Sequence, residues 1–258
     1  MLLAIDVGNT QTVIGLFADD GELADHWRIA SVATRTSDEL ALVVQQFLGF
    51  HGFSFDDETV SGIAVASGVP SVTAALREMS HRYFGKAPLV IEPGVRTGMP
   101  ILYDNPKEVG ADRIANAVAA YDMYGGPAIV VDFGTANTIE AVSAKGEYLG
   151  GAIFPGVEIS MDALFGRAAA LRRVELVEPK HVIGKSTVES IQSGAVYGFA
   201  GQVDALVDRF RSELGASTTV IATGGVAPLV MPHSRTIEHF EPWLTLIGLR
   251  IVWERNAT

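Results

Sequence analysis

The chain has 258 residues, of which 48% are hydrophobic and 19% charged, and its formal net charge is −11. The acidic balance argues against nucleic acid as the main partner, because phosphate backbones repel it. The absence of cysteine excludes disulfides and thiolate metal sites. No apolar run approaches the roughly 18 residues that a membrane span needs, and no basic segment precedes the first apolar run, so no secretory signal is expected. These features suit a cytoplasmic protein with one sizeable core or two modest ones.

Residues 2–18 (LLAIDVGNTQTVIGLFA) predict a hairpin with a small polar turn between two apolar runs. Gly8 allows a bulky anion to approach the backbone, and the N–H groups and hydroxyls of the turn are suited to contact phosphate. Asp6 ends the first strand, where it can hold a metal ion directly or through water. The alternative is an ordinary hairpin whose Asp and Asn only stabilise the turn.

The rest of the first half mixes strands and helices. Residue spacing predicts strands at 23–30, 60–66 and 89–91 and helices at 34–49 and 70–84. Ser37 is the expected N-cap of the first helix. Because a third strand follows the hairpin before any helix, the order predicts a mixed α/β layer structure rather than a strictly alternating one.

Residues 94–113 (GVRTGMPILYDNPKEVGADR) carry no sustained period, and long irregular segments inside compact domains are often functional. They run into a helix whose apolar residues recur from Ile114 onward, so Asp112 and Arg113 lie in its first turn. A helix N-terminus keeps a carboxylate ionised and able to accept a proton. The alternative is that Asp112 merely caps the helix and Arg113 is a solvated charge.

Gly125-Gly126-Pro127 marks the expected domain boundary, which divides the chain into domains 1–124 and 125–258. Directly after it, residues 128–142 (AIVVDFGTANTIEAV) repeat the N-terminal pattern, and Asp132 follows Asp6 by 126 residues. A repeat of this length indicates a duplicated domain. Two such loops suggest a nucleotide clamped between two related lobes.

The second half is expected to continue with a strand, two helices, a strand and a final helix, at 147–154, 155–171, 186–214, 218–222 and 243–253. The longest helix is either continuous or broken at 198–201. Thr223-Gly224-Gly225 offers a flat surface for an adenine, with a plain strand-to-helix turn as the alternative. Gly184-Lys185-Ser186 does not make a P-loop, because Pro179 stands where the first glycine belongs.

These stretches resemble type III pantothenate kinase, in this order and with these intervals. The resemblance covers nearly the whole chain through 6–13, 110–113 (GADR), 132–138, 150–156 (GGAIFPG), 223–225 and 244–249. Single loops of the D-x-G type occur across actin-like and sugar-kinase ATPases, whereas their combination with GADR in a short chain is specific. The resemblance implies an α/β fold of two ribonuclease H-like domains, the actin-like ATPase fold, with mixed sheets and flanking helices. It also implies a cytoplasmic homodimer.

The activity that the resemblance implies is ATP-dependent phosphorylation of pantothenate to 4′-phosphopantothenate, the first step of coenzyme A biosynthesis. The ATP phosphates would be held by Asp6, Val7, Gly8, Asn9, Thr10, Gln11, Thr12 and Val13, and Mg²⁺ by Asp6 through those phosphates. Thr135 would touch ATP, and Asp132 would bind a monovalent cation, K⁺ or NH₄⁺. Asp112 would accept the proton of the acceptor hydroxyl. Pantothenate would contact Tyr103, Gly110, Ala111, Asp112, Arg113 and Thr187.

Two residues depart from the family's second loop, which commonly has D-F-G-T-A-T-T with an Asp further on. Asn137 replaces a threonine, and Glu140 stands where that Asp is common. Because Asn can still donate and accept hydrogen bonds, ATP binding is expected to survive.

Two other functions stay open from the sequence. One is another small-molecule kinase or a phosphatase of the same fold. The other is a non-catalytic regulatory member of the family, against which the intact Asp6, Asp112 and Asp132 count.

Overall fold

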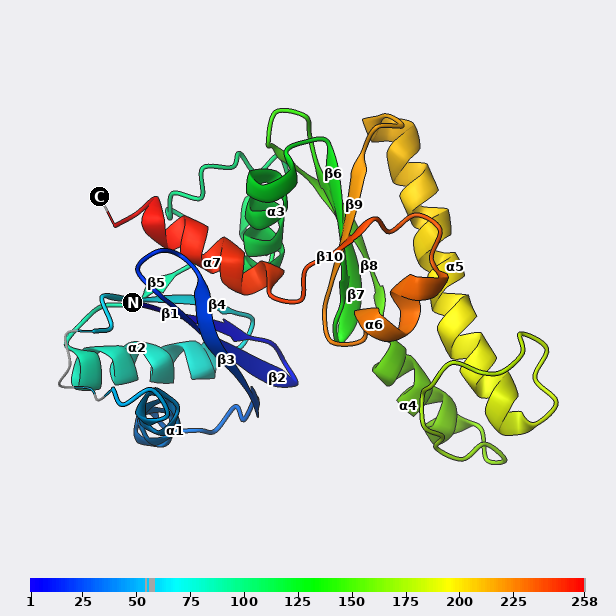
Figure 1. Ribbon diagram of the computed structural model, residues 1–258, viewed down its shortest axis with the longest axis horizontal. Helices are drawn as coiled ribbons and strands as arrows, with labels where there is room; N and C mark the ends of the chain where they lie inside the picture. The colour runs from blue at the N-terminus through cyan, green and yellow to red at the C-terminus, as the bar shows by residue number, and fades with distance from the viewer. Residues whose placement is uncertain (54, 56–58, 258) are drawn as a thin grey trace. The chain divides into compact units, whose positions relative to one another are not determined.

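The computed structural model describes residues 1–53, 55 and 59–257, which form two compact units (Figure 1). Unit 1 consists of Met1–Ala119 and Leu244–Thr258, and unit 2 of Ala120–Trp243. The division expected after residue 124 differs from these units. The C-terminal helix belongs to unit 1, because it packs on the first sheet although it follows the second half in sequence.

Unit 1 holds a five-stranded mixed sheet in the order β3-β2-β1-β4-β5. Its strands are β1 (Leu2–Val7), β2 (Gln11–Phe17), β3 (Leu23–Ala30), β4 (Gly62–Ser67) and β5 (Leu89–Val90). β1, β2 and β3 pair antiparallel, which confirms the predicted hairpin, and β4 and β5 run parallel to β1. The polar turn therefore lies at the carboxyl end of the central strand.

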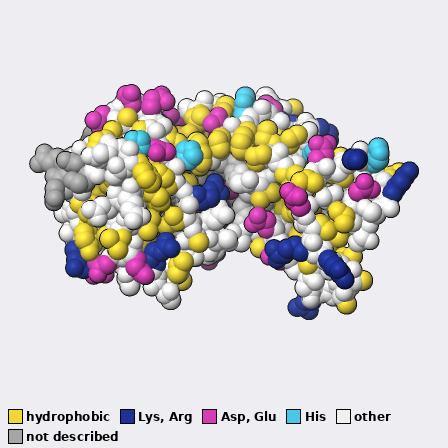
Figure 2. Space-filling view, turned by 60° about the horizontal axis from the view of Figure 1, so that its bottom comes forward, with side chains coloured by type: hydrophobic (Ala, Val, Ile, Leu, Met, Phe, Trp, Pro, Cys, Tyr) yellow, Lys and Arg dark blue, Asp and Glu magenta, His cyan; other side chains and the backbone are white. Residues whose placement is uncertain are grey.

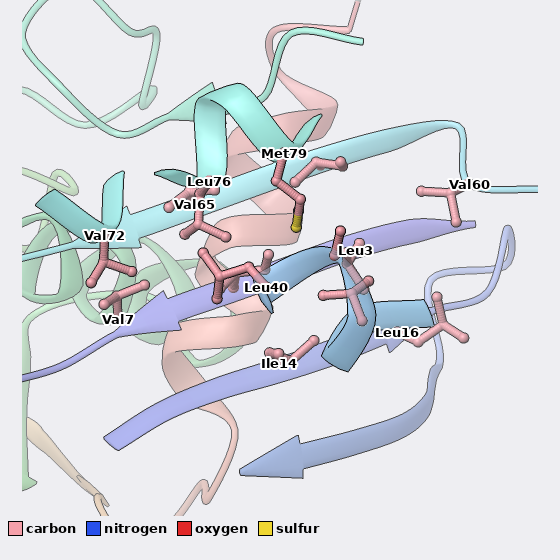
Figure 3. Close-up of a cluster of buried hydrophobic side chains, with 14 of the residues drawn as sticks. Leu3, Val7, Ile14, Leu16, Leu40, Val60, Val65, Val72, Leu76 and Met79 are labelled. Atoms are coloured by element: carbon pink, nitrogen blue, oxygen red, sulfur yellow. The ribbon is translucent and has the colours of Figure 1, made fainter. Parts of the chain in front are cut away.

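Two helices, α1 (Ser37–Gly49) and α2 (Pro70–Phe84), cover one face of this sheet. Thr36, rather than the expected Ser37, is the N-cap of α1, since it exchanges hydrogen bonds with Glu39 in a capping box. The core beneath these helices is aliphatic (Figure 3). Its labelled members are Leu3, Val7, Ile14, Leu16, Leu40, Val60, Val65, Val72, Leu76 and Met79.

Residues 3, 5 and 7 of β1 enter this core, so the alternation of side chains places Asp6 on the opposite face of the sheet. Helix α7 (Leu244–Glu254) packs on that opposite face, in contact with β1, β2 and β4. Gly15 and Gly62 leave room for it, because a β-carbon at either position would collide with a side chain of α7. The C-terminal helix thus covers the strand that carries Asp6.

Unit 2 repeats this topology in a sheet of order β10-β9-β6-β7-β8. Its strands are β6 (Ala128–Phe133), β7 (Ala136–Val142), β8 (Tyr148–Pro155), β9 (Thr219–Thr223) and β10 (His239–Phe240). β6 pairs antiparallel with β7 and parallel with β9, as β1 does with β2 and β4. The strand order therefore shows the duplication that the two loops indicated. The short strand β10 was not among the expected elements.

The helices of unit 2 are α4 (Val157–Arg167), α5 (Thr187–Leu214) and the short α6 (Ala227–Val230), followed by the 3₁₀ turn η2 (Met231–His233). α5 is continuous, which answers the question left open by the sequence. These helices and the sheet share one core. Its buried members include Ile129, Val131, Phe133, Ile139, Val157, Phe199 and Val203.

Helix α3 (Ala111–Tyr124) follows the 3₁₀ turn η1 (Pro106–Glu108), and the chain passes from unit 1 to unit 2 within it. On the face of the molecule shown in Figure 2, acidic side chains lie beside basic ones, and apolar areas are interrupted by polar atoms. None of the helices within the described residues is long and apolar enough to cross a membrane.

Candidate active site

The turn between β1 and β2 is tight and largely exposed. Gly8 donates its N–H to the carbonyl oxygen of Gln11 at 3.0 Å, which closes the turn. Asn9, Thr10 and Gln11 are exposed, and Asp6 is half-buried at the end of the strand. Successive backbone N–H groups in such a turn form a concave site for an anion. The turn is therefore chemically suited to contact phosphate oxygens.

Three of the side chains expected at the ATP phosphates have other environments. Val7 is buried in the core of unit 1. The hydroxyl of Thr12 lies 2.8 Å from that of Ser31, and Oε1 of Gln11 accepts a hydrogen bond from Nη1 of Arg28 at 2.6 Å. Val7 can therefore offer only its backbone to a ligand. The side chain of Gln11 is held by Arg28 of β3, and that of Thr12 by Ser31, which directly follows β3.

The second loop, between β6 and β7, meets two other turns of unit 2. A β-carbon at Gly224, whose φ is +96°, would lie 2.7 Å from Oδ1 of Asp132 and 2.5 Å from the carbonyl oxygen of Phe133. Gly156, the N-cap of α4, donates its N–H to the carbonyl oxygen of Thr135 at 3.1 Å. The loop, the start of α4 and the turn after β9 thus converge at the carboxyl end of β6. Ligands of open α/β sheets bind at this end of the strands.

Asp112 lies in the first turn of α3 with an exposed side chain. Its Oδ1 accepts the backbone N–H of Arg113 at 2.8 Å. The same oxygen occupies the space where a β-carbon of residue 110 would stand, so Gly110 leaves room for this carboxylate orientation. Asp112 is therefore both accessible and oriented, as a proton acceptor must be.

Arg113 and Asn116, which follow Asp112 in α3, are both buried, and Asn116 contacts helix α7. Arg113 is only 8% exposed, so the alternative that it is a solvated charge is wrong. Asn116 is 1% exposed, and its Oδ1 accepts a hydrogen bond from Oγ1 of Thr245 at 2.8 Å. A satisfied buried polar contact of this kind fixes the orientation of the elements that it joins. The start of α3 is thus held within unit 1.

The remaining predicted acceptor residues belong to different units. Tyr103 is half-buried in the segment of unit 1 between β5 and η1. Thr187 is the exposed first residue of α5 in unit 2. Unit 1 therefore contains the first loop, Tyr103 and residues 110–113, and unit 2 contains the second loop and Thr187.

The two departures from the usual second loop, Asn137 and Glu140, are fully buried on opposite faces of β7. Glu140 shares the face of Asp132, and its Oε2 accepts the hydroxyl of Tyr148 at 2.5 Å. Asn137 pairs in register with Phe133 on the core face, and neither polar atom of its side chain has a hydrogen-bond partner within the part of the chain that the structure describes. The Asn137 side chain is therefore not on the face of the sheet that carries Asp132.

No group of three or more His, Asp or Glu side chains that could hold a metal ion occurs among residues 1–53, 55 and 59–257. An ion that binds together with a nucleotide needs fewer protein ligands. Mg²⁺ commonly keeps several waters and takes one or two carboxylates plus substrate phosphates. Asp6 and Asp132 each provide one carboxylate at the carboxyl end of a central strand.

The family model for type III pantothenate kinase matches residues 2–209. The chain belongs to the type III pantothenate kinase family. A relative of that name from Streptomyces griseus subsp. griseus is 60% identical over 100% of this chain and 99% of its own length. Another, from Moorella thermoacetica, is 56% identical over 100% of both chains. The family predicted from the motifs is confirmed.

Solved structures share the fold of this pantothenate kinase family member at low identity. A Campylobacter jejuni protein described as a Baf family transcriptional activator superposes with a TM-score of 0.62 at 18% identity, covering 99% of this chain and 98% of that one. The activator of 2-hydroxyisocaproyl-CoA dehydratase from Clostridium difficile, solved with ADPNP, gives 0.60 at 13% identity, covering 99% and 97%. The predicted class is confirmed as an α/β fold of the actin-like ATPase and sugar-kinase type, with two mixed sheets and flanking helices.

Proposed function

We propose that this protein is a pantothenate kinase, which transfers the γ-phosphoryl group of ATP to the primary hydroxyl of pantothenate and yields 4′-phosphopantothenate. Full-length membership of the family supports this assignment. The structural observation that carries it is the exposed carboxylate of Asp112, oriented at the start of α3 in the same unit as the first polar turn.

In this proposal the ATP phosphates lie against the β1–β2 turn, residues 6–13. The chain binds them mainly through backbone N–H groups, because Val7 is buried and the side chain of Thr12 bonds to Ser31. Asp6, half-buried at the strand end, fits as the carboxylate beside a nucleotide-bound Mg²⁺. When bound, Mg²⁺ neutralises charge on the transferring phosphoryl group.

The second loop offers negatively polarised oxygen atoms, which can coordinate K⁺ or accept hydrogen bonds from NH₄⁺. The carboxylate of Asp132 and the carbonyl of Phe133 both border the space beside Gly224 that a β-carbon would fill. Asp132 is our proposed ligand for the monovalent cation, and the exposed Thr135 our proposed ATP contact. The flat turn at Gly224 suits the adenine.

The proposed pantothenate contacts are Tyr103 and residues 110–113 in unit 1 and Thr187 in unit 2. Asp112 orients the pantothenate hydroxyl and accepts its proton as the oxygen forms a bond to the γ-phosphorus. The bond from that phosphorus to the β–γ bridging oxygen breaks, and ADP leaves with that oxygen. An alcohol is a very weak acid, so the proton moves late, and positioning with charge neutralisation supplies most of the rate. We further propose that the protein forms a homodimer and that Thr187 contacts the bound pantothenate.

A coupled assay of ADP release tests this function directly. The full chain is incubated with ATP, Mg²⁺ and either K⁺ or NH₄⁺, and pantothenate, hexoses, acetate and water are compared as phosphoryl acceptors. We expect ADP release that depends on pantothenate, with the phosphorylated product detected by mass spectrometry. Turnover with a hexose or acetate alone would assign a different kinase, and release of phosphate to water would assign a phosphatase. No turnover with any acceptor would overturn the enzyme assignment.

A further inference from the structure

The last residues of the chain hold the irregular segment that leads to the acceptor residues. Asn256, just beyond α7, pairs with the backbone of Arg96 in both directions. Its Oδ1 accepts the N–H of Arg96 at 3.3 Å, and its Nδ2 donates to the carbonyl oxygen at 2.9 Å. Nδ2 also donates to the carbonyl oxygen of Val252 at 2.8 Å. One side chain therefore joins the end of α7 to the start of this segment.

Arg255, next to Asn256 in the chain, binds the same segment at Thr97 and Gly98. Its guanidinium donates to the carbonyl oxygen of Thr97. It also lies beside Gly98, whose φ is +69°, where a β-carbon would stand 2.6 Å from Nη1. Thr97 in turn holds Met99: its Oγ1 accepts the N–H of Met99 at 3.3 Å, and its hydroxyl donates to the carbonyl oxygen of Met99 at 3.1 Å. The path of the chain is thus defined up to four residues before Tyr103.

Helix α7 also holds the other end of the acceptor segment. Near its start, Thr245 donates to Asn116 of α3 at 2.8 Å. One turn later, Gly248 lies against the backbone of Ala115, where a β-carbon would collide with the carbonyl group. All acceptor residues proposed in unit 1 lie between these two attachments.

Since α7 packs on the face of β1 that carries Asp6, it contacts both parts of the proposed reaction site in unit 1. We propose that α7 with Arg255 and Asn256, which we call the C-terminal brace, is a positioning element for the acceptor. It determines where Tyr103 and Asp112 lie relative to the strand that bears the phosphate turn. Only the effect on the KM for pantothenate rests on the proposed function; the structural role of the brace does not.

The test is Asn256→Ala, compared with Glu254→Gln as a matched control. Glu254 lies at the end of the same helix but bonds to Arg250, within α7 itself. We expect Asn256→Ala to raise the KM for pantothenate about tenfold, the size typical of losing a well-made hydrogen bond at a positioned site. The KM for ATP should change less than about twofold, because the side-chain hydrogen bonds of Asn256 go to Arg96 and Val252 rather than to the phosphate turn. Asn256→Asp, which loses both Nδ2 bonds, should share the defect.

Amide hydrogen exchange on the full chain supplies a readout that does not depend on activity. Asn256→Ala should speed exchange in peptides covering 95–103, while peptides covering β1 and α2 keep their wild-type rates. Unchanged exchange at 95–103, or an equal rise in the KM for both substrates, would overturn the proposal. If the wild-type chain does not phosphorylate pantothenate, the proposed function fails, and exchange still decides whether the brace orders this segment.

Discussion

Gly224 lies directly against the carboxylate of Asp132. The contact joins the turn after β9 to the end of β6, and the positive φ of +96° at residue 224 is what allows it. Only glycine adopts such a φ without strain. Because Asp132 is our proposed cation ligand, this turn controls the environment of its carboxylate as well as the surface offered to a nucleotide.

We therefore expect Gly224→Ala to weaken both stability and ATP binding. The new β-carbon would stand 2.7 Å from Oδ1 of Asp132, so the carboxylate or the turn must move. We predict a loss of about 1–3 kcal/mol in the free energy of unfolding from backbone strain, and at least about a tenfold loss of ATP affinity, measured by calorimetry. Gly85→Ala is the control, because Gly85 has a φ of +64° but no atom within 4 Å of the added carbon. Equal ATP affinity in both variants would contradict this prediction.

Replacement of Asp112 by Asn should separate binding from turnover. The variant keeps the shape of the side chain but cannot accept the hydroxyl proton. General-base catalysis typically contributes a hundredfold or more, so we expect kcat to fall by at least about a hundredfold with ATP affinity unchanged. Asp104→Asn makes the same change of charge at an exposed position of the same segment and should retain activity. Turnover of Asp112→Asn near that of the wild type would refute the assigned role.

The two polar loops could be predicted from the sequence because each has a strong local signal. An apolar run ending in Asp, followed by Gly and small polar residues, specifies a strand and a tight turn wherever it occurs. The repeated pattern at Asp6 and Asp132 therefore indicated the duplicated topology, which the strand order confirms. The fold class itself was implied by the family resemblance. The start of α3 at 110–113 (GADR) was also predictable, because apolar residues recur at helical spacing from Ile114 onward.

What the sequence could not indicate depends on contacts between distant segments. Chain order assigned the final helix to the second half, whereas it packs on the first sheet. Arg113 was equally compatible with a solvated charge until its neighbours were known. The role of Asn256 had no signal at all, because its partner Arg96 is 160 residues away. The face of Asn137, by contrast, follows from strand alternation with Phe133 and could have been inferred.

The hydrogen-bonded phenol of Tyr124 should contribute to the free energy of unfolding of unit 2, and this contribution should disappear at high pH. Its phenol donates to the carboxylate of Glu241, and its ring lies 4.6 Å from that of His239. Burial, then this hydrogen bond and the charge of Glu241, raise the pKa of Tyr124 to about 12. Because the pKa in the folded state exceeds the ordinary value of about 10, the stability is fully present below about pH 10 and is lost as the pH rises towards 12.

The measurement is the free energy of unfolding in denaturant between pH 8 and pH 12 for the wild type and Tyr124→Phe. We expect the wild type to be the more stable below about pH 10 and the difference to shrink above it. Subtracting the free energy of unfolding of Tyr124→Phe from that of the wild type at each pH removes the effect of lysines and other tyrosines, which titrate in both proteins. A difference that stays constant across this range would mean that Tyr124 titrates normally in the folded protein.

The buried amide of Asn137 should be a net cost to the fold. Its two polar side-chain atoms are buried without a hydrogen-bond partner among the described residues, and such burial typically costs about 1–3 kcal/mol. Asn137→Val, a β-branched residue of similar size on a core-facing strand position, should therefore raise the free energy of unfolding by about 1–3 kcal/mol. Asn116→Val is the matched control. Asn116 is equally buried but accepts a hydrogen bond from Thr245, so its replacement should destabilise the protein. If thermal unfolding shows both variants shifted in the same direction, hydrogen-bond satisfaction is not what distinguishes these two asparagines.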